Sequence, residues 1–281
     1  MGIKLTKMQG CGNDFVILDY AEFLKLDMTM AEAAKKLCDR HFGVGADGLI
    51  IPNTNEKDAD IGWFFYNSDG STAQMCGNGM RCFAKYVYDR GLVDKTEFSV
   101  KTLAGIISPK ILEDGTVKVN MSKPILESAK IPFVPNDNLN YTISVKNMIM
   151  EGNAVSMGNP HFVIFVGLDD DPMKFAKEFG PLLEVSAEFP EKTNVEFIKI
   201  KSHKKIQLAV WERGCGITLA CGTGACASVV AGILNGYIEN SVEVELPGGT
   251  VHIDWAGSKE DTNYDVFLTG PAEYVFEASL F

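Results

Sequence analysis

Cys76-Gly77-Asn78-Gly79 recurs as Cys221-Gly222-Thr223-Gly224, which lies 145 residues further along the chain (221 minus 76). A second pair of stretches has nearly the same spacing. Gly12-Asn13-Asp14-Phe15 matches Gly158-Asn159-Pro160-His161, with 146 residues between the two asparagines (159 minus 13). Because separate features share one offset, we predict that the chain of 281 residues is a duplication of one unit of about half its length.

A helix is predicted to begin directly after each of these cysteines. Within Met80–Val87 the apolar side chains recur at helical spacing, and Ala225–Leu234 is apolar or small nearly all round, which is typical of a helix buried on every side. Gly91 and Gly236 are expected to end the two runs. Each cysteine would then lie at a helix N-terminus, which binds anions such as carboxylates and should lower a thiol pKa from its ordinary value of about 8.5.

The remaining pattern favours an α+β fold, because predicted strands outnumber helices and do not alternate with them regularly. The predicted strands are Phe15–Asp19, Val117–Met121, Tyr141–Val145, Phe162–Val166, Val195–Ile200, Ile206–Trp211, Val242–Leu246, Thr250–Trp255 and Tyr264–Leu268. Thr29 and Glu32 form a capping box that opens a helix to about Asp39, and Asp171-Pro172 opens another. Lys123–Asn138, with three prolines, is the predicted linker.

Composition narrows the class of protein. Hydrophobic residues make up 46% of the chain and charged residues 22%, which are ordinary globular values. The net charge of −11, from 26 Lys+Arg and 37 Asp+Glu, makes nucleic acid an unsuitable main partner. With seven cysteines, no export signal and no apolar run long enough to span a membrane, we predict a soluble, cytoplasmic protein with reduced thiols and no membrane partner.

The cysteines allow several interpretations. Two buried, inert thiols at the start of core helices are one alternative, since cysteine is often buried. A zinc site is another, and it would draw on Cys76, Cys82, Cys215, Cys221 and Cys226. The close Cys-x-x-Cys spacing of structural zinc and redox sites does not occur in the chain, so we predict no metal. Apart from Cys76 and Cys221, the cysteines are predicted to be packing residues: Cys11, Cys38, Cys82, Cys215 and Cys226.

Two activated thiols from two related halves suit the inversion of a stereocentre without a cofactor. One thiolate removes the α-proton, and a thiol on the opposite face returns one, so the two groups should be chemically equivalent. Helix N-termini would hold the carboxylate on which negative charge grows.

The sequence resembles the diaminopimelate epimerase family from end to end. The stretches that carry the resemblance are Lys7–Phe15, Asn67–Ser71, Met75–Cys82, Met157–His161, Trp211–Gly214 and Ala220–Ala225. It implies an isomerase that interconverts LL- and meso-diaminopimelate in lysine biosynthesis, independent of pyridoxal phosphate and without any other cofactor. Cys76 and Cys221 would be the acid/base thiols, with His161 and Glu212 beside them as orienting or tuning catalytic residues.

The resemblance also implies the binding residues and the architecture. Substrate would be bound by Asn13, Asn67, Gly77, Asn78, Asn159, Asn194, Glu212, Arg213, Gly222 and Thr223. Each half would be a β-barrel-like sheet around a central helix, with the active site in the cleft between the halves. The expected domains are residues 1–122 plus 270–281, carrying Cys76, and residues 123–269, carrying Cys221, and family members commonly form homodimers.

Two positions depart from the family pattern. Gly48 stands where some members carry a substrate-contacting glutamine, and Ile217 replaces a glutamate before the second cysteine. The alternatives are a proline or hydroxyproline racemase, which also uses paired cysteines, and a non-catalytic, thiol-rich metal-binding protein. The assignment of each cysteine as base for one isomer stays open.

Overall fold

The computed structural model describes residues 2–280, which form two compact units. One unit comprises Met1–Asn120 with Thr269–Phe281, and the other comprises Met121–Leu268. The outermost residues of the first predicted domain, Met1 and Phe281, lie outside the described residues. Strands predominate over helices in the described part of both units, so the α+β prediction is confirmed.

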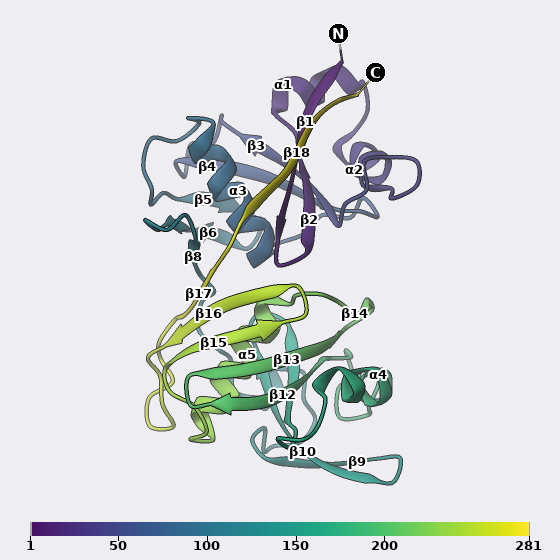
Figure 1. Ribbon diagram of the computed structural model, residues 1–281, viewed down its shortest axis with the longest axis vertical. Helices are drawn as coiled ribbons and strands as arrows, with labels where there is room; N and C mark the ends of the chain where they lie inside the picture. The colour runs from purple at the N-terminus through teal and green to yellow at the C-terminus, as the bar shows by residue number, and fades with distance from the viewer. Residues whose placement is uncertain (1, 281) are drawn as a thin grey trace. The chain divides into compact units, whose positions relative to one another are not determined.

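The first unit is built on a sheet in the order β18-β1-β2-β3-β4-β5-β6. These strands are β18 (Glu273–Leu280), β1 (Ile3–Gly10), β2 (Asn13–Ile17), β3 (Gly48–Asn53), β4 (Ile61–Asn67), β5 (Val100–Thr102) and β6 (Gly105–Ile107), and a hairpin of β7 (Lys110–Ile111) and β8 (Val117–Asn120) follows. Successive neighbours pair antiparallel, antiparallel, parallel, antiparallel, parallel and antiparallel. Figure 1 shows the C-terminal strand β18 running beside the N-terminal strand β1.

The second unit repeats this topology in the order β9-β10-β11-β12-β13-β15-β16, with β17 next. Its strands are β9 (Tyr141–Val145), β10 (Met148–Ser156), β11 (Pro160–Phe165), β12 (Asn194–Ser202), β13 (Lys205–Glu212), β15 (Ser241–Leu246) and β16 (Gly249–Trp255), while β14 (Gly216–Ile217) pairs with β13. Strand β17 (Val266–Gly270) begins in this unit, which ends at Leu268. The succession of pairings from β9 to β16 is the same as in the first unit. The predicted duplication is confirmed.

The helices occupy matching places in the two units. After a short α1 (Tyr20–Phe23), α2 (Met30–Cys38) links β2 to β3, as α4 (Pro172–Leu183) links β11 to β12. The predicted caps are present, since Thr29 and Glu32 form a capping box and the Asp171 side chain accepts from the Met173 N–H. The helices after the two cysteines are α3 (Gly77–Asp89) and α5 (Gly222–Leu234).

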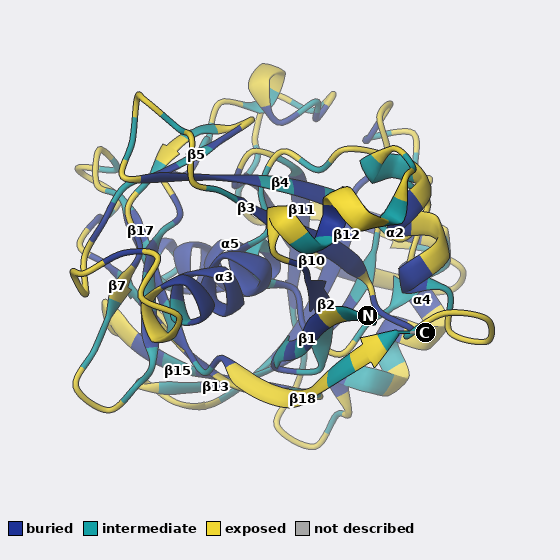
Figure 2. Ribbon diagram, turned by 90° about the horizontal axis from the view of Figure 1, so that it is seen from above, coloured by how far each residue is buried: buried dark blue, intermediate teal, exposed yellow. Residues whose placement is uncertain are grey.

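Each sheet curls around its own cysteine-led helix. Helix α5 contacts the neighbouring strands β10, β11 and β12 and also β16, which is separated from β12 by β13 and β15, so the sheet must bend around the helix. Helix α3 likewise contacts β1, β2, β3 and the β7–β8 hairpin. Both helices are largely buried, as Figure 2 shows by their dark blue colour. The prediction of a sheet around a central helix is therefore confirmed for each unit.

The predicted linker is wrong. Within Lys123–Asn138, Ile131 and Phe133 are buried in the core of the second unit, where Phe133 packs against Phe162 and Phe189. The apolar side chains between the prolines anchor the segment, so it belongs to the unit. No helix in the described part of the chain has both the length and the apolar character needed to cross a membrane.

Candidate active site

Cys76 is the N-cap residue of α3 in the first unit. Its extended backbone, with φ −143° and ψ 118°, turns the chain from the loop into the helix. The sulfur accepts a hydrogen bond from the Gly79 N–H at 3.4 Å, and the thiol donates to Oδ1 of Asn13 at 3.6 Å. The sulfur is therefore held at the helix N-terminus, and the side chain is partly exposed.

Asn13 and Asn78 are brought together beside Cys76. The Asn78 amide donates to Oδ1 of Asn13 at 3.2 Å, and the Asn13 amide donates to Asp47 at 2.6 Å. The fully buried Arg81 donates to Oδ1 of Asn78 at 2.9 Å and thereby fixes that side chain. These bonds connect the predicted binding asparagines to the thiol.

Asn67 lies at the end of β4, where its amide donates to the Ser71 hydroxyl at 3.0 Å. It is paired in register with Gly48 of β3. A Cβ at Gly48 would lie 2.7 Å from the ring of Phe65 and 2.8 Å from the Tyr66 carbonyl oxygen. The space is thus filled by Phe65, and the family's glutamine has no room there.

Cys221 is the N-cap residue of α5 in the second unit, with φ −122° and ψ 106°. It is buried, and its sulfur lies 3.5 Å from the Thr223 hydroxyl. Burial raises the thiol pKa well above its usual value, and the nearby carboxylates of Glu212 and Glu196 raise it further. The expectation of a lowered pKa at this helix N-terminus is therefore wrong for Cys221, because desolvation outweighs the field of the helix.

Glu212 ends β13 and contacts the thiol of Cys221. Its carboxylate also accepts a hydrogen bond from the Thr218 hydroxyl. Burial raises the pKa of Glu212, although both hydrogen bonds favour its charged form. A carboxylate with a raised pKa against a thiol is suited to exchange a proton with it.

His161 and Asn159 join the same group of side chains. Nε2 of His161 lies 3.0 Å from Oδ1 of Asn159, whose amide nitrogen donates to the Thr223 hydroxyl at 3.3 Å. The other ring nitrogen, Nδ1, lies 2.7 Å from Oε1 of Glu196. The structure thus connects His161, Asn159, Thr223 and Cys221 within one unit.

Asn194 has a different setting, because backbone groups occupy both of its polar atoms. Its amide donates to the Pro160 carbonyl at 2.8 Å, and its Oδ1 accepts from the Arg213 N–H at 2.9 Å. The exposed Arg213 side chain donates to the Glu191 carbonyl at 3.1 Å. Asn194 therefore fixes the backbone that presents Arg213.

Glu196 is the site residue that sequence reasoning missed. It is fully buried on β12, and its Oε2 has no hydrogen-bond partner among the described residues. The available signal was an acidic residue between two apolar ones in a predicted strand, Val195-Glu196-Phe197. A buried carboxylate requires a partner, and His161 provides it.

The other cysteines are not grouped as a metal site. Cys11, Cys38, Cys82 and Cys226 are buried as expected, and burial raises the pKa of Cys38 and of Cys82 to about 12. Cys215 is exposed in the turn after β13, so its predicted packing role is wrong. Across residues 2–280, no three His, Cys, Asp or Glu side chains gather closely enough to hold a metal ion.

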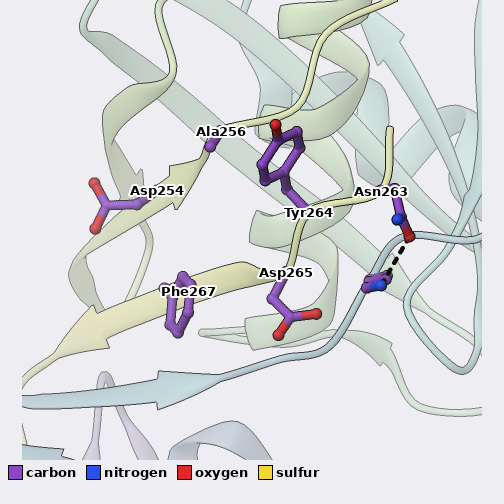
Figure 3. Close-up of a pocket in the computed structure, with 7 residues that line it drawn as sticks. Asp254, Ala256, Asn263, Tyr264, Asp265 and Phe267 are labelled. Atoms are coloured by element: carbon purple, nitrogen blue, oxygen red, sulfur yellow. Dashed lines mark hydrogen bonds between the residues drawn. The ribbon is translucent and has the colours of Figure 1, made fainter. Parts of the chain in front are cut away.

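A pocket in the second unit lies apart from these groups. Figure 3 shows its lining of Lys123, Asp254, Ala256, Asn263, Tyr264, Asp265 and Phe267. The Lys123 ammonium donates to Asn263 at 2.7 Å, which the dashed line marks. None of the predicted catalytic or binding residues lines this pocket.

Solved structures with a similar fold include proteins whose names describe other activities. A Bacillus anthracis phenazine biosynthesis protein of the PhzF family matches with a TM-score of 0.67 and 17% identity, covering 100% of this chain and 99% of that one. A hydroxyproline epimerase from Agrobacterium vitis matches with a TM-score of 0.69 and 10% identity, covering 99% and 92%. At these identities the likeness shows the fold alone.

Sequence comparison is more specific. The family model described as diaminopimelate epimerase matches residues 5–127 and again residues 153–275, one match in each half of the chain. A diaminopimelate epimerase of Heliobacterium modesticaldum is 45% identical over 287 residues, covering 99% of both chains. One of Carboxydothermus hydrogenoformans is 46% identical over 282 residues, covering 99% of this chain and 100% of the relative. The chain belongs to the diaminopimelate epimerase family.

Proposed function

We propose that this chain interconverts LL- and meso-diaminopimelate in lysine biosynthesis, with Cys76 and Cys221 as the acid/base pair and without pyridoxal phosphate. The observation that carries the proposal is the repeated geometry of the two thiols. Each is the N-cap residue of a 13-residue helix at the same place in a duplicated unit. The homodimer and the cytoplasmic location stay predictions.

The reaction balances with two thiols on opposite faces of one carbon. One sulfur, as thiolate, takes the α-proton and becomes a thiol, and the electron pair left on Cα is delocalised into the substrate carboxylate. The second thiol then gives its proton to the other face and becomes the thiolate. The site is left with the two protonation states exchanged, ready for the reverse isomer.

Charge on the carboxylate is stabilised by the helix N-termini. The N–H groups of Gly77 and Asn78 in α3, and those of Gly222 and Thr223 in α5, belong to the first helical turns, whose donors lack partners within the helix. Preorganised donors of this kind contribute about 10²–10³ each in rate. Glycine at the first position of each helix lets a ligand approach the backbone closely.

The thiolate at Cys221 requires a proton acceptor, because burial raises its pKa. Glu212 contacts this thiol, and burial raises its own pKa toward the range in which it can accept that proton. We assign Glu212 this role. At the distal end of the substrate, the exposed guanidinium of Arg213 suits a carboxylate, and Asn67 offers an amide oxygen to an ammonium group.

The test combines substrates with cysteine variants. The enzyme is incubated with LL-diaminopimelate, L-proline and trans-4-hydroxy-L-proline, and stereoisomers are separated by chiral chromatography. We expect turnover of diaminopimelate alone, and complete loss of it in Cys76→Ala and in Cys221→Ala. Cys215→Ala, which removes an exposed thiol, is the matched control and should retain activity.

Retained activity in either of the first two variants would contradict the two-thiol mechanism. Turnover of proline or hydroxyproline in place of diaminopimelate would support the racemase alternative. Stoichiometric zinc in the purified protein together with no turnover would support the metal-binding alternative.

A further inference from the structure

The duplication supplies an internal comparison for the buried pair of His161 and Glu196. In the first unit, the parallel register of β2 and β3 pairs Phe15 with Gly48 and Ile17 with Ile50. In the second unit, the register of β11 and β12 pairs His161 with Asn194 and Val163 with Glu196. His161 therefore stands where the first unit has Phe15, and Glu196 stands where it has Ile50.

The two pairs lie beneath the same point of the cysteine-led helix. A Cβ placed on Gly79, the third residue of α3, would lie 3.4 Å from the ring of Phe15 and 3.5 Å from Ile50. A Cβ on Gly224, the third residue of α5, would lie 2.7 Å from Oε1 of Glu196. The same place is apolar under one thiol and ionisable under the other.

This difference is not a requirement of the fold. The first unit shows that an aromatic and an aliphatic side chain fill the place, with Phe15 and Ile50 both fully buried. Replacing such a pair by buried ionisable groups has a desolvation cost that packing alone does not repay. The pair of His161 and Glu196 is therefore expected to have a function.

Hydrogen bonds run without interruption from this pair to the sulfur. Oε1 of Glu196 lies 2.7 Å from Nδ1 of His161, and Nε2 lies 3.0 Å from Oδ1 of Asn159. The Asn159 amide donates to the Thr223 hydroxyl at 3.3 Å, and that hydroxyl lies 3.5 Å from the sulfur of Cys221. All five residues belong to the second unit.

The donors and acceptors determine which group donates in each hydrogen bond of this series. In the arrangement proposed below, both ring nitrogens of His161 donate to the oxygens that they face, Oε1 of Glu196 and Oδ1 of Asn159. Because the Thr223 oxygen accepts from Asn159, its own hydrogen is directed to Cys221. The Gly224 backbone N–H also contacts the Cys221 sulfur, as the Gly79 N–H contacts that of Cys76, and the Thr223 hydroxyl is an additional side-chain donor.

We propose that Glu196 is a positioning residue that acts through His161, Asn159 and Thr223 to keep a hydrogen-bond donor on the sulfur of Cys221 and so favours its thiolate. The inference deepens the proposed function, because it explains how the more deeply buried of the two thiols can serve as a base. The titratable groups that face Cys221 are Glu212 on β13, Glu196 on β12 and His161 on β11. The charges of Glu212 and Glu196 both oppose the thiolate, and the hydrogen bond from the Thr223 hydroxyl favours it. The proposal is that Glu196 favours the thiolate more through this hydrogen bond than it opposes it by its charge.

Glu196→Gln tests the proposal, because the side chain keeps its shape and loses its charge. His161 then carries one hydrogen, directed to the new amide oxygen, and its Nε2 becomes an acceptor. The side-chain amide of Asn159 then flips, so that its nitrogen donates to Nε2 of His161 and its oxygen faces Thr223. The Thr223 hydroxyl donates to this oxygen and no longer donates to the sulfur of Cys221. A hydrogen bond to a charged group of this kind corresponds to about one to two pH units.

The readout is the ultraviolet absorbance of the thiolate during pH titration without substrate. The contribution of Cys221 is obtained by subtracting the titration of the same protein carrying Cys221→Ala. We expect the midpoint of Cys221 to rise by about one to two pH units in Glu196→Gln. The contribution of Cys76, obtained in the same way with Cys76→Ala, should not move.

Thr223→Val distinguishes a relayed effect from a direct charge effect. It should raise the midpoint of Cys221 by itself, and Glu196→Gln should add nothing further in its presence. If Glu196 acted only by its charge, its removal would lower the midpoint in both backgrounds, and that result would overturn the proposal, as would an unchanged midpoint. If Glu196→Gln does not fold, Thr223→Val alone tests the proposal: an unchanged titration midpoint of Cys221 in this variant would overturn it. Because no substrate is present, the outcome is independent of the test of epimerase activity.

Discussion

The two glycines at the third positions of α3 and α5 form a matched pair for a stability test. Alanine is about 1 kcal/mol more favourable than glycine inside a helix, so each Gly→Ala change has the same expected gain. At Gly79 the nearest atom to a new Cβ is 3.4 Å away, which is ordinary contact. We therefore expect Gly79→Ala to be as stable as the wild type or up to about 1 kcal/mol more stable.

Gly224→Ala should have the opposite effect. The new Cβ would lie 2.7 Å from Oε1 of Glu196 and 3.2 Å from the sulfur of Cys221. Glu196 is fully buried, and that oxygen holds His161, so displacing the carboxylate breaks a charge-assisted hydrogen bond worth about 1.5–3 kcal/mol. After the helical gain of about 1 kcal/mol is subtracted, the expected net loss in the free energy of unfolding is about 0.5–2 kcal/mol.

Urea unfolding followed by circular dichroism measures both variants against the wild type. The expected result is a lower midpoint for Gly224→Ala and an equal or higher midpoint for Gly79→Ala. Equal stability of the two variants would refute the reasoning, since it would mean that Glu196 is free to move and that its bond to His161 contributes little.

Three further predictions concern the capping box, a surface carboxylate and a buried thiol. Thr29→Ala removes the acceptor for the Glu32 N–H and should lower stability by about 1 kcal/mol in the same urea assay. Hydrogen bonds, first of all from Lys95, lower the pKa of Asp60 to about 2, so Asp60→Asn should reduce stability above about pH 4. Because these bonds stabilise only the ionised carboxylate, the difference should disappear as Asp60 is protonated, and the melting curves of variant and wild type should converge as the pH falls to about 2. Burial raises the pKa of Cys82 to about 12, and peptide mapping after iodoacetamide treatment of the native protein at neutral pH should find it unmodified.

Features set by local sequence were predicted well. The capping box at Thr29, the Asp171-Pro172 start of α4 and the two cysteine-led helices depend on residues close together in the chain. The duplication was predicted because it repeats residue types at a fixed offset. Each of the nine predicted strands overlaps an observed one, with ends displaced by a few residues.

Strands that contain glycine for tertiary reasons were missed. In β10, a Cβ on Gly152 would lie 2.2 Å from the ring of Phe162, so the glycine makes room for a core side chain on the neighbouring strand. In β3, Gly48 makes room for Phe65 in the same way. Glycine is unfavourable in a strand, but here the side chain of an adjacent strand requires it. That side chain can be identified only when the pairing of the strands is known.

The residues of the candidate site also fall into those predicted from local sequence and those that only the fold identifies. The thiols, the glycines and the asparagines stand in motifs, and the sequence pointed to them directly. Glu196 lies 35 residues from His161, and only the parallel register of β11 and β12 brings them together. The raised pKa of Cys221 was likewise beyond sequence reasoning, because burial is a property of the folded unit.

The most direct test of the two-thiol account is the early time course of epimerisation in D₂O. LL-diaminopimelate is supplied undeuterated, and the isotope content at Cα is measured by mass spectrometry in recovered LL substrate and in meso product. With two thiols, the proton removed by one is not the one returned by the other. The account predicts meso product carrying one α-deuterium and recovered LL substrate without deuterium. Meso product that retains the substrate's own hydrogen, or LL substrate that gains deuterium before product forms, would indicate a single base and contradict the account.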